Sequence, residues 1–88
     1  MIYVIKIKFN SNVDEKTKNR IINEFCQSKI YDMFEIFHYM DYAFSINKNV
    51  CDLEAVYQAS NFFRKYKECS QINYFLLAEN YGSINLWE

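Results

Sequence analysis

Residues 3 to 9 read YVIKIKF, a stretch in which apolar and charged side chains alternate. A period of two is typical of a β-strand with one buried face and one solvated face. Because Lys6 and Lys8 occupy the charged phase, we expect Tyr3 and Phe9, on the opposite phase, to face the core. The reverse orientation would bury two unpaired lysines, at a far greater free-energy cost.

Two later segments repeat apolar residues at intervals of three and four, the spacing of an amphipathic helix. The first covers residues 13 to about 29, where Asn12 and Glu15 fit a capping box. The second begins at residue 50 or 52 and ends near residue 68, with Asn49 as its expected cap. The predicted apolar stripe of this second helix consists of Leu53, Val56, Ala59, Phe63 and Tyr66.

Short apolar segments predict the remaining strands at residues 33–39, 42–47, 72–78 and 84–88. The first two form a hairpin joined at Met40 and Asp41, and its inward face carries Tyr42 and Phe44. The third is apolar on both faces, as expected of a strand that is covered on both sides. Residues 80–83 contain the single glycine of the chain and are predicted to form the last turn.

This order of elements, β-α-β-β-α-β with an added C-terminal strand, favours a ferredoxin-like α+β sandwich. In that fold an antiparallel sheet carries both helices on one face. Another α+β arrangement of the same elements is the alternative. A length of 88 residues predicts a single α+β domain spanning residues 1–88.

Charge and composition restrict the class of partner and the location. The net charge of −1 gives no broad attraction to nucleic acid or to an anionic membrane. The chain lacks an apolar run long enough to span a bilayer, and its start does not resemble a signal peptide. We therefore expect a cytoplasmic protein that does not bind membranes.

The residues that usually carry chemistry are sparse. Cys26, Cys51 and Cys69 are too widely spaced for a structural zinc site and are expected to be reduced, mostly buried thiols. His38 has no local nucleophile signature, and Asp32 is explained by a solvated loop. One glycine cannot build a phosphate-cradling loop. The sequence therefore predicts no enzyme activity, no metal, no cofactor and no small-molecule substrate.

Two short segments, residues 2–4 (IYV) and 41–45 (DYAFS), resemble the two strand motifs of the RNA-recognition motif family. The resemblance implies a single-stranded RNA-binding domain whose stacking side chains are Tyr3, Tyr42 and Phe44. The strand phase instead assigns these three side chains to the core. RNA binding is therefore the alternative function.

Aromatic residues make up 19% of the chain, more than a small core needs, and Tyr57 and Phe62 are among those without a predicted core position. Surface aromatics usually mark an interface. The predicted partner-binding residues are Phe37, Tyr39, Phe75, Tyr81 and Trp87, with Glu35 and Asp41 as a polar rim. We expect a protein-binding module, either an inhibitor or adaptor of a larger protein or a homodimer. Its size and composition would suit a phage- or virus-encoded inhibitor of a host defence system.

Overall fold

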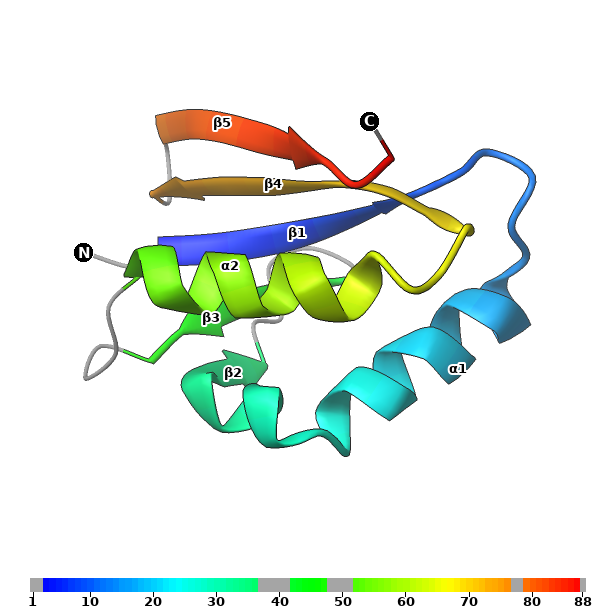
Figure 1. Ribbon diagram of the computed structural model, residues 1–88, viewed down its shortest axis with the longest axis horizontal. Coiled ribbons are helices and arrows are strands. Elements are labelled where there is room, and N and C mark those ends of the chain that lie inside the picture. Colours follow the sequence, from blue (N-terminus) through cyan, green and yellow to red (C-terminus); the bar gives the residue numbers. More distant parts are fainter. Residues whose placement is uncertain (1–2, 37–41, 48–51, 77–78, 88) are drawn as a thin grey trace.

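The computed structural model describes residues 3–36, 42–47, 52–76 and 79–87 (Figure 1). In chain order its elements are β1 (Tyr3–Phe9), α1 (Glu15–Cys26), the 3-10 helix η1 (Lys29–Met33), β2 (Phe34–Ile36), β3 (Ala43–Ile46), α2 (Asp52–Phe63), β4 (Cys69–Leu76) and β5 (Glu79–Asn85).

The strands form one sheet in the order β2-β3-β1-β4-β5, and every neighbouring pair is antiparallel. Strand β1 is central and pairs with both β3 and β4. The prediction of an α+β fold with an antiparallel sheet and two helices is confirmed. Strand β5 continues the sheet beyond β4, so an additional C-terminal strand is present, but it covers Glu79–Asn85 rather than the predicted residues 84–88.

The alternation in residues 3–9 orients β1 as predicted. Ile5 and Ile7 are buried in the core, whereas Lys8 is exposed and Lys6 is only partly buried. The core joins these strand residues to side chains of both helices, such as Phe25 of α1 and Phe63 of α2. Both helices therefore cover the same face of the sheet.

Phe25 lies at the centre of this core. Its ring centroid is 4.8 Å from that of Phe63 and between 5.2 and 6.0 Å from those of four other aromatic rings. Phe62 is one of the four and is 7% exposed, so the expectation that it lacks a core position is wrong. The core holds more of the aromatic residues than the strand pattern alone indicated.

Helix α1 begins later than predicted. Its cap is Asp14, whose carboxylate accepts a hydrogen bond of 2.8 Å from the Thr17 N–H, rather than Asn12. This bond satisfies a backbone donor that has no partner within the helix. The helix ends at Cys26, three residues short of the predicted end, because residues 29–33 form a 3-10 helix instead.

The hairpin strands are shorter than predicted. Strand β2 covers only Phe34–Ile36, and residues 37–41, including the expected joint, lie outside the described residues. Strand β3 begins at Ala43 rather than Tyr42, because Tyr42 adopts the left-handed backbone conformation (φ 58°) that extended strands exclude. The expected cap Asn49 also lies outside the described residues, and α2 ends at Phe63 instead of near residue 68.

The predicted turn at residues 80–83 is wrong, because these residues belong to β5. Strand β4 starts three residues earlier than expected, at Cys69. The pairing of β4 with β5 extends to Asn85, beyond the predicted turn. The register shifts between Tyr74 and Phe75, which pair with Gly82 and Asn80. A β-bulge therefore accommodates Tyr81 inside a strand, where the local composition suggested a turn.

Candidate functional site

Strand β5 extends the sheet beyond the area that two helices can cover. Packed helices lie about 8–10 Å apart, so two of them cover roughly four strands spaced at about 4.8 Å. The sheet has a fifth strand at its margin, beyond β4 (Figure 1). On the helix side, the surface between α2 and β5 is therefore not covered by either helix.

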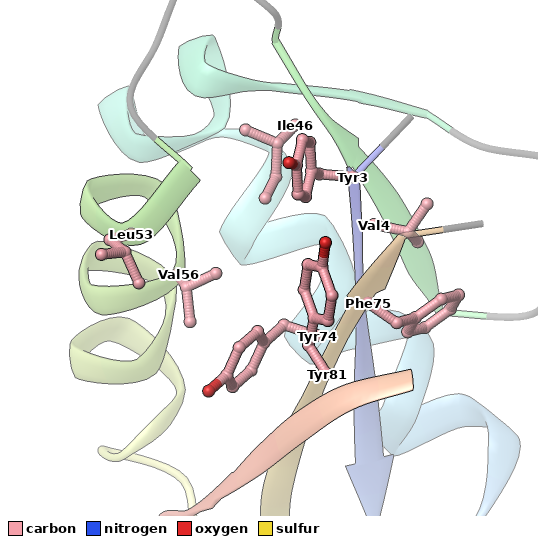
Figure 2. Close-up of a pocket in the computed structure, with 8 residues that line it drawn as sticks. All are labelled: Tyr3, Val4, Ile46, Leu53, Val56, Tyr74, Phe75 and Tyr81. Carbon is pink, nitrogen blue, oxygen red and sulfur yellow. The ribbon is translucent and has the colours of Figure 1, made fainter. Parts of the chain in front are cut away.

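A pocket of about 260 Å³ opens at this place (Figure 2). It is lined by Tyr3, Val4, Ile46, Leu53, Val56, Tyr74, Phe75 and Tyr81. Leu53 and Val56 come from α2, and Tyr81 comes from β5. We call this pocket, together with Tyr57 one helical turn beyond Leu53, the α2–β5 groove.

The sides of the α2–β5 groove carry large apolar side chains that face solvent. Leu53 is 68% exposed, Tyr57 is 66% exposed and Tyr81 is 50% exposed. Residues four apart on a helix are neighbours, so Leu53 and Tyr57 form one continuous strip along α2. Within the described residues a fourth large apolar side chain, Trp87, is similarly exposed at 49%. Three of these four side chains thus belong to one site.

The β-bulge explains why Tyr81 joins this site. Gly82 pairs with Tyr74, whose side chain packs against the helix-side core. Strict alternation would then direct the preceding residue to the opposite face, but an extra residue in a bulge can point to the same face as its neighbour. The Tyr81 ring accordingly lies 6.1 Å from that of Tyr3, centroid to centroid.

The glycine at position 82 leaves space for the Tyr74 side chain, which lines the groove. A Cβ atom at this position would lie 3.3 Å from the Tyr74 hydroxyl oxygen, closer than side chains normally approach. The absence of a side chain therefore allows the Tyr74 phenol to lie across β5.

The predicted contact residues are only partly brought together. Phe75 lines the pocket with Tyr81, although Figure 2 shows Phe75 and Val4 on the other side of the strands from α2. Trp87 is remote from the groove, since its indole N–H donates a 2.6 Å hydrogen bond to the carbonyl of Cys69, at the opposite end of β4. Glu35 lies in β2, paired with Ser45. The remaining predicted contacts, Phe37, Tyr39 and Asp41, lie outside the described residues.

Leu53 and Tyr57 were missed as contact residues. Leu53 continues the apolar stripe of α2 by spacing and was therefore expected in the core, but it lies in the first turn of the helix and is largely exposed. The available signal was the spacing of Leu53 and Tyr57, which places a second apolar strip beside the buried one.

The resemblance to the RNA-recognition motif family implies three stacking residues, Tyr3, Tyr42 and Phe44. They lie on the side of the sheet that the helices cover. Phe44 is 3% exposed and packs in the core, which leaves no face for a base to stack on. The Tyr42 ring meets Phe9 edge to face, with centroids 5.2 Å apart, and its hydroxyl donates to the Glu15 carboxylate. This hydrogen bond is the main cause that lowers the pKa of Glu15.

The described cysteines, Cys26 and Cys69, are free thiols, and Cys51 lies outside the described residues. Burial raises the pKa of Cys69 to about 12 and also raises the pKa of Cys26. Both are therefore protonated at neutral pH, and a protonated thiol is a poor nucleophile. His38 lies outside the described residues.

Comparisons of the chain with protein-family models, with curated proteins and with solved structures found no match. Over the described ranges, no helix is long and apolar enough to cross a membrane. The same ranges contain no group of three or more His, Cys, Asp or Glu side chains placed to hold a metal ion. The class that the fold defines is a small α+β domain with an antiparallel sheet.

Proposed function

We propose that this protein is a non-enzymatic protein-binding module and that the α2–β5 groove is its contact surface. The observation that carries the proposal is that Leu53 and Tyr81, both at least half exposed, line one pocket, and that the exposed Tyr57 follows Leu53 by one helical turn. Exposed apolar side chains that gather in one place usually mark an interface. Tyrosine is a favoured anchor there, because it buries a large area and freezes few rotatable bonds.

We further propose that the domain is a variant of the ferredoxin-like sandwich. The order β2-β3-β1-β4 and the packing of α1 and α2 on one face support this classification. The 3-10 helix η1 and the fifth strand are its departures from the simple pattern. A domain of this size suits an inhibitor or adaptor that acts by occupying the surface of a larger protein, including a viral inhibitor of a host defence enzyme, or a module that pairs with itself.

Site-specific photo-crosslinking tests the proposed contact surface. A photoreactive phenylalanine analogue replaces Tyr57 in the groove, and the matched control carries it at the exposed Lys16 on α1. We expect discrete protein adducts, formed in the cells that naturally make the protein, from position 57 alone. The added change Tyr81→Ser should abolish them. Equal adducts from both positions, or none from position 57, would refute the proposal.

Single-stranded RNA binding is the second candidate function. The observation that favours it is the sheet face opposite the helices, where β1 carries Lys6 and Lys8 and β4 carries Phe75, whose ring lies next to Val4. Lysines attract phosphates, and an aromatic ring can stack on a base. Fluorescence anisotropy at low salt tests it. Micromolar binding of an unstructured RNA that is lost in Phe75→Ala, and retained in Tyr57→Ala, would favour RNA over the protein partner.

A further inference from the structure

The outer edge of β5 is a surface that another strand can extend. Strand β5 ends the sheet, and no described strand pairs with its outer side. Edge strands in soluble proteins are commonly protected by lysine, by proline or by being very short. The opposite edge, β2, is three residues long, but β5 has seven residues and contains neither lysine nor proline. Beyond Glu79 and the bulge at Tyr81, residues 82–85 of β5 therefore form a regular, uncharged edge.

The hydrogen-bond pattern shows which groups of β5 point outward. The Leu86 N–H donates a 3.0 Å bond to the Ser70 carbonyl, next to β4. Backbone groups alternate in direction along an antiparallel strand, so Ile84 and Gly82 also face β4. Ser83, which lies between them, directs its N–H and C=O away from β4. A further strand would hydrogen-bond to these groups.

Two exposed charges of opposite sign, Glu79 and Arg64, lie toward opposite ends of the region between α2 and β5. Glu79 opens β5, which starts at the same end of the molecule as α2 (Figure 1). Arg64 is exposed at the other end, where its N–H still donates to the Ser60 carbonyl as in a helix. It follows Leu53 by about three full turns and therefore lies on the same side of α2.

These charges are complementary under a two-fold rotation. Strand β5 and α2 run in the same direction (Figure 1). Arg64 lies about 16 Å along the helix from Leu53. Glu79 lies about 7 Å before Tyr81 on the strand. Since Leu53 and Tyr81 line one pocket, the point midway between the two charges lies near Gly82 and Ser83. A two-fold axis there brings each Glu79 level with Arg64 of the other copy.

We infer that the partner at the α2–β5 groove is a second copy of this chain, joined by antiparallel pairing of β5 with β5 about an axis near Gly82 and Ser83. This inference rests on the proposed function and names its partner. Glu79 then lies opposite Asn85 or Trp87 of the second copy, so no like charges face each other across the strands. The sheet becomes continuous through ten strands.

The exposed side chains of the groove contribute area to this dimer. Three strand spacings separate the two β4 strands by about 14 Å, whereas helices in contact pack about 8–10 Å apart. The two α2 helices therefore do not touch across the axis, and the side chains that border the space between them are Leu53, Tyr57 and Tyr81 of both copies. At about 200 Å² per large side chain, the exposed parts of these three amount to about 370 Å² per copy. Together with the paired strands, the interface lies near the lower end of specific interfaces, about 1,200 Å². We therefore expect a reversible dimer with a micromolar Kd.

Sedimentation velocity of the full chain, from micromolar to submillimolar concentration, measures this equilibrium. Ser83→Pro removes the outward N–H donor at an edge position that tolerates proline, and it should weaken dimerisation about tenfold or more. Ser83→Thr keeps that donor and should dimerise like the wild type. Circular dichroism verifies that both variants are folded.

Charge reversal gives a test that is specific to the two-fold arrangement. Glu79→Arg and Arg64→Glu should each weaken self-association about tenfold at low salt, because both cross-axis pairs become repulsive. A mixture of the two variants should dimerise like the wild type, since every pair is again opposite in charge. If the wild type stays monomeric while position 57 crosslinks a different protein, the second-copy inference fails and the proposed function stands. If the wild type dimerises but Ser83→Pro does so equally, or the mixture does not recover, the β5 arrangement is wrong.

Discussion

Replacing Phe25 with alanine should be the most damaging single truncation among the core residues of the described chain. Phe25 is fully buried and meets five aromatic rings at centroid distances of 4.8–6.0 Å. Removal of a buried phenylalanine side chain costs about 3–5 kcal/mol, and the lost edge-to-face contacts favour the upper end. A domain of this length has a total unfolding free energy of about 4–13 kcal/mol. Phe25→Ala is therefore expected to be close to unfolded at 37 °C.

Urea denaturation monitored by far-ultraviolet circular dichroism measures the effect. Phe25→Leu provides a variant that stays folded, with an expected loss of about 1–2 kcal/mol. The m-value should be unchanged in Phe25→Leu, because the same surface is exposed on unfolding. The matched control is Phe9→Leu at the margin of the core, where the ring is only partly buried and a smaller loss is expected. If Phe25→Ala lowers the unfolding free energy by less than about 1 kcal/mol, the two helices do not both pack around this ring.

Three further outcomes follow from the described contacts. Asp14→Ala should lower the unfolding free energy measured by urea denaturation by about 1 kcal/mol, and Asn12→Ala should change it little, because only Asp14 caps α1. Equal losses in the two variants would contradict that cap. Leu53→Ser should lower the unfolding free energy by less than about 1 kcal/mol and Val56→Ser by more than about 2 kcal/mol, because Leu53 is 68% exposed and Val56 is 4% exposed. Burial raises the pKa of Cys69 to about 12, so the unfolding free energy should fall as pH rises from 9.0 toward 12. Cys69→Ala should make this decline shallower in denaturation measured across that pH range, and an unchanged slope would exclude Cys69 as a contributor.

The order of elements and the orientation of β1 could be predicted from sequence because both depend on local periodicity. Lysines at positions 6 and 8 cannot be buried without partners, and this requirement orients the whole central strand. The start of α1 could not be placed as well, because Asn12 and Asp14 are both good caps and only the path of the chain selects between them.

The site was harder to predict because it depends on pairing between distant segments. Tyr81 reaches the groove through a bulge whose position is set by the register of β4 against β5, and no local pattern encodes that register. Leu53 has the spacing of a core residue, yet the sheet beneath it is wider than the helical layer. Whether the Leu53 side chain is exposed therefore depends on how many strands and helices the fold contains, and not on the sequence of α2 alone.

Whether an aromatic residue is a phenylalanine or a tyrosine indicates how deeply its side chain is buried. The alternation of residues along the strands does not contain this information. Within the described residues every buried aromatic side chain is a phenylalanine, and every tyrosine is at least partly exposed. Burying a phenol without a hydrogen-bond partner is costly, whereas a phenylalanine ring carries no such cost. The tyrosines of the groove, such as Tyr57 and Tyr81, can bury their rings against a partner while their hydroxyls remain near water at the rim. An interface built in this way stays compatible with the free monomer in water, which agrees with the reversible association expected of the α2–β5 groove.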